Sequence, residues 1–157
     1  MGEKSAQRGS LDGRGLTIAL VAARYNLDIT EKLVEGALEV LAEHGAAAAP
    51  VIWVPGCMEL PVTAQAVVER GSADAVVALG CVIKGDTAHF EHVAGQCAAG
   101  LMQVSLDSGI PIAFGVLTTY DHAQALARAD KGREAAETAL EMANLLRTLG
   151  DAALAEV

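Results

Sequence analysis

Four short segments of almost uninterrupted apolar residues recur along the chain. They are Leu16–Ala22, Pro50–Val54, Asp74–Leu79 and Ile110–Val116. Runs of this length predict β-strands that are covered on both faces, as in a parallel sheet. Pro111 fits this interpretation, because proline is accepted at the first positions of a strand.

Longer segments with apolar residues at helical spacing follow each of these runs. They are Asp28–His44, Glu59–Arg70, His89–Asp107 and Asp121–Leu149. In the first segment, apolar residues recur three and four positions apart until Gly45 closes the predicted helix. Pro61 is compatible with the second helix because it lies in the first turn.

Strand and helix patterns thus alternate four times, with no internal repeat and no linker. This alternation predicts a single α/β domain in three αβα layers, with a mainly parallel four-stranded sheet of flavodoxin-like topology. The domain would cover residues 16–157 and follow a polar segment at residues 1–15. Whether that segment adds an N-terminal strand to the sheet stays open.

The composition excludes several kinds of partner. The 157 residues carry a formal net charge of −9 and only scattered Lys and Arg, so neither nucleic acid nor an anionic membrane is expected to bind. No run approaches the roughly 18 apolar residues of a membrane-spanning helix. Residues 1–15 lack the apolar core of a signal peptide, so we expect a cytoplasmic protein.

Small apolar side chains dominate the sequence, which is 52% hydrophobic but only 3% aromatic. This bias suits closely packed helices and suggests that some apolar surface is hidden between subunits. The three cysteines, Cys57, Cys81 and Cys97, lack the close CxxC spacing of a zinc site or a disulfide framework.

In doubly wound sheets, ligands bind in the crevice beyond the carboxyl ends of the strands. The segment after the third predicted strand is the most informative, because Gly85, Asp86 and Thr87 precede a helix whose first turn holds His89. Free amides at a helix start and a threonine hydroxyl can hold phosphate, and an imidazole can transfer protons near neutral pH. Alternatively, Thr87 only caps the helix and His89 is a surface residue.

Other candidate residues allow two interpretations each. Tyr25, after the first strand, could stack on a flat heterocycle or be a rim aromatic. Glu59, at a helix start, could bind hydroxyl groups or simply favour the helix dipole. Arg128 and Lys131 share one helix face by their spacing, and a solvated face is their default interpretation.

Taken together, these segments resemble lumazine synthase. The matching segments are ARYN (23–26), VEGAL (34–38), VPGCMELP (54–61), DAVVALGCVIKGDTAHFEHVA (74–94), IPIAFGVLTT (110–119), QALARA (124–129) and KGREAAETALEMANLL (131–146). The resemblance runs from about residue 16 to residue 149. Its most specific part is GxVIxGxTxHF at 80–90, followed by FGVLT.

The resemblance implies an enzyme that joins 5-amino-6-(D-ribitylamino)uracil to 3,4-dihydroxy-2-butanone 4-phosphate. The products would be 6,7-dimethyl-8-ribityllumazine, phosphate and water, and neither a cofactor nor a metal would be needed. Positioning and proton transfer suffice when one reactant already carries a good leaving group.

By the same resemblance, His89 would be the catalytic residue that transfers protons. The substrate-binding residues of the same subunit would be Tyr25 against the pyrimidine; Cys57, Met58 and Glu59 along the ribityl chain; Val82 and Ile83 at the pyrimidine edge; and Gly85, Asp86 and Thr87 around the phosphate.

A neighbouring subunit would complete the site with Phe114, Arg128 and Lys131, Arg128 pairing with the phosphate. Glu134 would lie where an acidic partner for the histidine is expected. The resemblance therefore implies a homo-oligomer, either a pentamer or an assembly of pentamers, with riboflavin synthase as a candidate further partner.

The chain departs from the family's pattern at several positions. Tyr25 replaces the usual Phe, Met58 a bulky aromatic residue, and Lys84 the usual Arg. Between Arg128 and Lys131, typical members carry a longer, glycine-rich kink, whereas here the join is only Ala-Asp. We therefore expect the last two helices to run on as one, and an active pentamer or pair of pentamers ahead of a sixty-subunit shell.

One alternative function stays open, an inactive relative that binds a flavin-like ligand or acts as a scaffold. The presence of Glu59, Thr87, His89 and Arg128 argues against it. A phosphate-receiving signalling domain is excluded, because residues 22–24 and 80–81 offer Ala-Ala-Arg and Gly-Cys where acidic residues are required. A flavodoxin-type carrier would need a glycine- and hydroxyl-rich loop after the first strand, which ARYN is not.

Overall fold

A computed structural model of the chain describes residues 7–155. The elements in chain order are β1 (Thr17–Ala23), α1 (Leu27–Glu43), β2 (Ala47–Ala48), β3 (Ile52–Val54), the 3-10 helix η1 (Cys57–Glu59), α2 (Leu60–Glu69), β4 (Ala75–Ile83), α3 (His89–Ser108), β5 (Ile112–Thr119), α4 (His122–Ala127) and α5 (Lys131–Ala155). No helix among these is long and apolar enough to cross a membrane.

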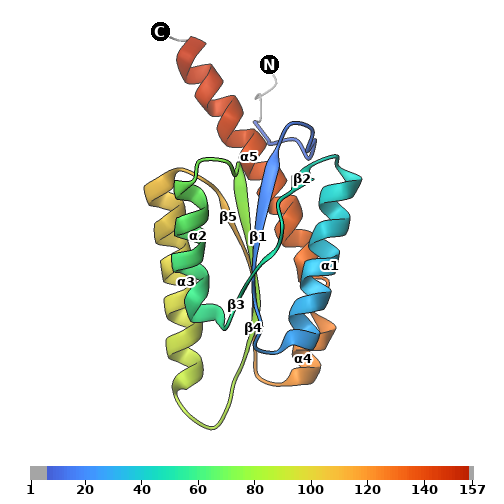
Figure 1. Cartoon of the computed structure of the whole chain (residues 1–157), viewed down its shortest axis with the longest axis vertical. Helices are drawn as coiled ribbons and strands as arrows, with labels where there is room; N and C mark the ends of the chain where they lie inside the picture. Colours follow the sequence, from blue (N-terminus) through green and yellow to red (C-terminus); the bar gives the residue numbers. More distant parts are fainter. Residues whose placement is uncertain (1–6, 156–157) are drawn as a thin grey trace, which may run out of the picture.

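The strands form one parallel sheet that is the middle of three layers. Both β2 and β3 pair with β1, which pairs with β4, and β4 pairs with β5. Figure 1 shows α1, α4 and α5 on one face of this sheet and α2 and α3 on the other. The predicted three-layer, flavodoxin-like α/β architecture is therefore confirmed.

The core consists of two apolar clusters, one on each face of the sheet. Leu20 of β1 belongs to the cluster that includes buried residues of α1 and α5, and its neighbour Val21 belongs to the cluster shared with α2 and α3. Successive residues of a strand point to opposite faces. A strand between two helical layers must therefore be apolar at every position, which is why the strands read as continuous apolar runs.

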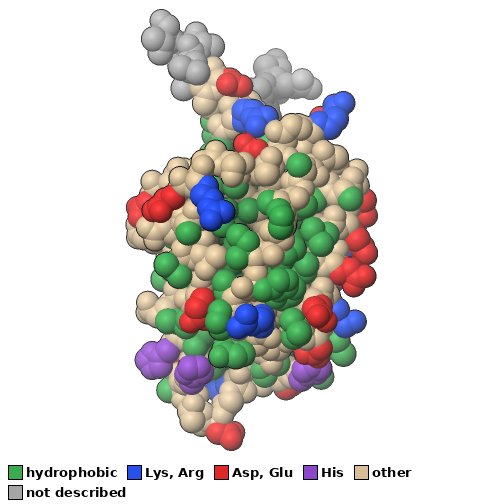
Figure 2. Space-filling view, in the orientation of Figure 1, with side chains coloured by type: hydrophobic (Ala, Val, Ile, Leu, Met, Phe, Trp, Pro, Cys, Tyr) green, Lys and Arg blue, Asp and Glu red, His purple; other side chains and the backbone are tan. Residues whose placement is uncertain are grey.

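The second predicted strand, 50–54, is corrected to two short pieces at the edge of the sheet. Thr17 pairs with Ala47, but Val21 pairs with Ile52, so the edge holds one residue more than β1 between these pairs. Pro50 lies in this interruption, and proline has no N–H to donate to a neighbouring strand. Apolar side chains cover much of this edge (Figure 2). Residues 7–16 form no strand, and residues 1–6 lie outside the described part of the chain.

The prediction that the third strand ends at Leu79 is also wrong. β4 continues through Gly80 to Ile83, and β5 follows it residue by residue, from Gly80 opposite Val116 to Ile83 opposite Thr119. Gly80 is needed inside the strand because a Cβ there would lie 2.6 Å from the Cys57 sulfur. The glycine thus marks a close approach between strand and loop, and not the end of the strand.

The expected fusion of the last two helices does not occur. Asp121 caps α4 by accepting a hydrogen bond from the Gln124 N–H (2.8 Å), and residues 128–130 form a turn before α5 begins. The direction of α5 is set by its contact with α1, where Gly132 meets the main chain of Leu33. Even a two-residue join therefore leaves two helices, because α5 must start against α1.

Candidate active site

The carboxyl ends of the strands lie together at the lower end of the molecule in Figure 1, where histidine side chains also gather in Figure 2. A pocket of about 360 Å³ opens there. Its lining includes seven residues singled out from the sequence: Tyr25, Cys57, Met58, Glu59, Val82, Ile83 and His89. Three separate strand ends and the start of α3 thus converge on one cavity.

Tyr25 stands at the mouth of this pocket, with 68% of its surface exposed. Its main chain is fixed to the end of β3, because the Tyr25 N–H donates to the Pro55 carbonyl (3.1 Å). Its ring lies directly against Gly56, where an added Cβ would come within 2.8 Å of the ring carbons. The glycine therefore lets the ring lie close to the loop while most of the Tyr25 surface stays exposed.

Glu59 lines the pocket and also stabilises the local turn. Its Oε2 accepts a hydrogen bond from the Gly56 N–H (2.9 Å) across η1. This bond orients the carboxylate, because one oxygen is held by the turn. The other oxygen is left able to accept hydrogen bonds from a ligand.

The loop from Lys84 to Ala88 is exposed and joins β4 to α3. The Thr87 hydroxyl accepts a long hydrogen bond from the His89 N–H (3.4 Å), while Gly85 and Asp86 lie in the open part of the loop. Gly85, Asp86 and Thr87 are not part of the pocket wall but precede His89, which is. The arrangement leaves free amides at the start of a 20-residue helix beside the pocket.

The remaining predicted residues lie on a different surface of the chain. Phe114, Arg128, Lys131 and Glu134 line a second hollow of about 470 Å³, between β5 and the turn that joins α4 to α5. Lys131 pairs with Glu134 (2.6 Å between Nζ and Oε2), and 43% of the Phe114 surface is exposed. No residue lines both hollows. Within one chain, the cationic group and the His89 pocket are therefore not brought together.

Four residues of the pocket lining were not among the predicted site residues: Asn26, Gly56, Cys81 and Val93. Cys81 lies in its wall, and Asn26 follows Tyr25 with a φ of 60°. A signal for Asn26 was present, because asparagine is one of the few residues that adopt this left-handed conformation readily.

Cys57 and Cys81 are the two cysteines in the pocket wall, and the pKa of each thiol is raised. The contact with the Cys97 thiol, together with burial, raises the pKa of the Cys57 thiol above its usual range. Burial raises the pKa of the Cys81 thiol to about 11. Protonated thiols act as small apolar groups, so Cys57 and Cys81 shape the wall of the pocket.

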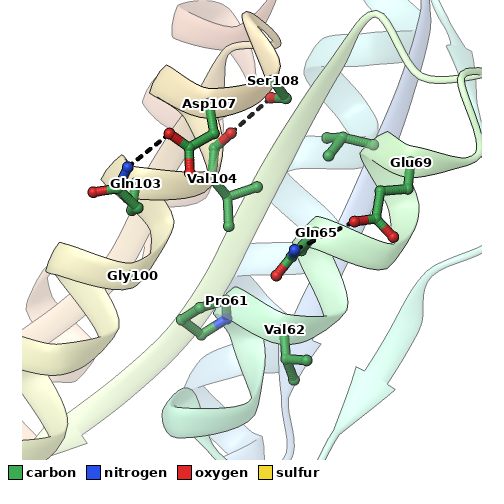
Figure 3. A pocket seen from close by; sticks show the side chains of 10 residues that line it. Pro61, Val62, Gln65, Glu69, Gly100, Gln103, Val104, Asp107 and Ser108 are labelled. Atoms are coloured by element: carbon green, nitrogen blue, oxygen red, sulfur yellow. Dashed lines mark hydrogen bonds between the residues drawn. The ribbon is translucent and has the colours of Figure 1, made fainter.

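A groove of about 490 Å³ lies elsewhere, between α2 and α3 (Figure 3). Its polar side chains bond within their own helices, Gln65 to Glu69 (3.3 Å) and Gln103 to Asp107 (2.7 Å). None of the residues predicted to bind substrate lines it. Among residues 7–155, no group of three or more His, Cys, Asp or Glu side chains could hold a metal ion.

Comparison with known protein families assigns most of the chain to one family. The family model for 6,7-dimethyl-8-ribityllumazine synthase matches residues 15–147, which is most of the 157-residue chain. The match spans β1 to most of α5 and so includes both hollows. The chain therefore belongs to the 6,7-dimethyl-8-ribityllumazine synthase family, whose members are transferases of riboflavin biosynthesis.

Proposed function

We propose that this chain condenses 5-amino-6-(D-ribitylamino)uracil with 3,4-dihydroxy-2-butanone 4-phosphate, forming 6,7-dimethyl-8-ribityllumazine. The observation that carries the proposal is the single pocket that collects an exposed aromatic ring, an oriented carboxylate and a histidine. These groups match a flat heterocycle, a chain of hydroxyl groups and a reaction driven by proton transfer.

The pyrimidine would stack on the exposed ring of Tyr25 and meet the main chain of Ile83 at its edge. The Lys84 N–H donates to the Thr119 carbonyl on β5 (2.9 Å). Successive residues of a strand direct their main-chain polar groups to opposite sides. The main-chain polar groups of Val82 therefore point to β5. The main-chain polar groups of Ile83 point to the opposite side, where β1 has already ended. Ile83 is thus the better candidate for hydrogen bonds to the heterocycle, and Val82 for apolar contact.

The ribityl chain would run along Cys57, Met58 and Glu59. Glu59 is the polar member of this group, and its oxygen not engaged by Gly56 would accept hydrogen bonds from ribityl hydroxyls. Met58 is half exposed and would cover the chain with an apolar side chain. Because the hydrogen bond from the Gly56 N–H already orients Glu59, this side chain loses less conformational freedom when the ligand binds.

The chemistry would proceed by amine addition to the ketone with loss of water, elimination of phosphate, and ring closure with loss of a second water. His89 would accept and return the protons that these steps move. The departing phosphate would be held by the amides and hydroxyl of Gly85, Asp86 and Thr87. Riboflavin synthase, which would consume the lumazine, is proposed as a further partner, and we expect the reaction in the cytoplasm.

A second subunit would complete the site. The residues that line the His89 pocket include neither Lys nor Arg, although one substrate carries a phosphate. Arg128 and Lys131 lie on the other hollow, with the exposed Phe114 beside them. Placing that hollow against the pocket of a neighbouring copy supplies the missing cations and covers the aromatic ring. A ring of five copies repeats this contact without leaving an open end.

The expectation of a pentamer or pair of pentamers ahead of a larger shell rested on fused helices. Since α4 and α5 are separate, the short join gives no reason to favour the smaller assembly. The shared site still requires a homo-oligomer, which we propose to be a pentamer, and light scattering on the active protein would give its further assembly.

The test is incubation of the protein with both substrates and no added metal or nucleotide, followed by the absorbance and fluorescence of the lumazine. Steady formation of the lumazine with release of one phosphate per turnover is expected. Binding of the pyrimidine without turnover would refute the proposal and favour the inactive ligand-binding relative. Activity that a chelator abolishes and a metal restores would contradict the proposed chemistry.

A further inference from the structure

Asn26 occupies an unusual place between the stacking residue Tyr25 and the start of α1. It is the one non-glycine residue within 7–155 that has a positive φ, at 60°. Its main-chain carbonyl accepts hydrogen bonds from the N–H groups of Ile29 (3.0 Å) and Thr30 (3.1 Å) and so begins α1. The left-handed conformation thus fixes the direction in which the chain turns from β1 into the helix.

Near the end of β4, the side chain of Asn26 supplies a hydrogen-bond donor that a neighbouring strand would otherwise supply. Pairing between β1 and β4 ends with Ala22 opposite Leu79, although β4 itself continues to Ile83. Beyond this point, the Asn26 side-chain amide donates to the Cys81 carbonyl (2.9 Å). Cys81 is buried, so without this donor its carbonyl would be an unsatisfied acceptor in the protein interior.

This one bond joins the two segments that would hold the pyrimidine. Arg24 and Tyr25 bond through their main chains to Val54 (2.8 Å) and Pro55 (3.1 Å), which ties the loop to the end of β3. The amide of Asn26 ties the same loop to β4, two residues before Ile83. The spacing between the Tyr25 ring and the main chain of Ile83 therefore depends on Asn26.

We propose that Asn26 is a positioning residue that sets the pyrimidine between Tyr25 and Ile83 through its bond to Cys81. The proposal rests on the function proposed above, but it assigns a role to a side chain for which that function gave none. A misplacement of about 1 Å in a binding group can cost about 10²-fold in rate. A side chain that holds two binding segments together can therefore control affinity for one substrate while leaving the other unaffected.

Two substitutions at Asn26 test the hydrogen bond to Cys81 separately from the left-handed backbone conformation. Asn26→Asp keeps the size and the tolerance of positive φ but turns the donor into an oxygen that repels the Cys81 carbonyl. Asn26→Gly keeps the conformation at no steric cost and removes the side chain. Both variants should raise the KM and the Kd for the pyrimidine about tenfold. The KM for the butanone phosphate should stay within about twofold of its original value, because the start of the phosphate loop is held by the bond from the Lys84 N–H to the Thr119 carbonyl.

Asn144→Asp is the matched control. The Asn144 side-chain amide also donates to main-chain carbonyls, those of Ser10 (2.7 Å) and Asp12 (2.9 Å), but none of these residues lines the pocket. This variant should lose folding stability while both KM values stay unchanged. A pyrimidine KM that Asn26→Gly leaves at the original value would overturn the positioning role, as would a parallel loss for both substrates.

Failure of the proposed function would look different. The unsubstituted protein would then form no lumazine, whether or not it binds the pyrimidine. The positioning role would be decided without ligand, by comparing crystal structures of the unsubstituted protein and Asn26→Gly. A shift of Tyr25 relative to Ile83 by about 1 Å supports the role, and superimposable positions overturn it.

Discussion

Gly132 lies where α5 begins against α1, and replacing it with alanine tests how tightly that contact is packed. A Cβ at Gly132 would collide with the Leu33 carbonyl oxygen and lie 2.7 Å from the Leu33 Cα. The obstacle is the main chain of a fully buried residue, so it cannot rotate away as a flexible side chain could. Gly132→Ala should therefore push the start of α5 away from α1.

The size of the effect follows from two opposing contributions. Replacing glycine by alanine in a helix favours folding by up to about 1 kcal/mol. Overpacking a well-packed contact costs about 1–3 kcal/mol, and a clash with main chain belongs in the upper part of this range. We expect Gly132→Ala to lower the free energy of unfolding by about 1–2 kcal/mol.

Gly150→Ala provides the matched control, because Gly150 lies in the same helix and has no atom within 4 Å of an added Cβ. It should raise the free energy of unfolding by about 0.5–1 kcal/mol. Urea unfolding of both variants at one protein concentration measures the difference, since assembly makes apparent stability concentration-dependent. Equal stabilisation by both substitutions would refute the close contact between α5 and α1.

The other predictions concern the site. His89→Ala should lower kcat by about 10²–10⁴-fold yet leave residual turnover, because positioning survives the loss of acid–base catalysis; an unchanged kcat would remove His89 from the mechanism. Arg128→Ala should raise the KM for the butanone phosphate far more than that for the pyrimidine, since a guanidinium binds phosphate bidentately; equal weakening would contradict this role. Cys57 and Cys81, whose raised pKa values keep them protonated, should resist iodoacetamide until the chain is unfolded; fast labelling of the folded protein would contradict their burial.

The architecture could be predicted from the sequence because each strand is covered on both faces and each helix on one. The boundaries that were missed depend on contacts between distant residues. Gly80 looked like a strand end, yet it lies inside β4 because the Cys57 sulfur packs against it. The short join after α4 looked like a fusion, yet Gly132 and Leu33 set the direction of α5. No local pattern contains either contact.

The pocket was predictable in part for a similar reason. Tyr25, Glu59 and His89 follow different strands, and the carboxyl ends of parallel strands share one edge of the sheet. The structure gathers all three in one pocket. Asn26 was missed because its partner, the Cys81 carbonyl, is 55 residues away in the sequence. This carbonyl lacks a strand partner only because β4 extends beyond its pairing with β1. The catalytic and binding roles of these residues stay predictions until they are measured.

The two hollows connect the stability of α5 with the proposed chemistry. Arg128 and Lys131 bracket the turn between α4 and α5, and Gly132 follows immediately. Their position relative to β5 is therefore fixed by the contact of α5 with α1, which Arg133 reinforces through ion pairs with Glu39 (2.8 Å) and Glu43 (3.0 Å). In the proposed pentamer these cations serve the phosphate of a neighbouring subunit. A defect at the α1–α5 contact of one chain would thus weaken phosphate binding in the site of the next, so Gly132→Ala should raise the KM for the butanone phosphate while Gly150→Ala should not.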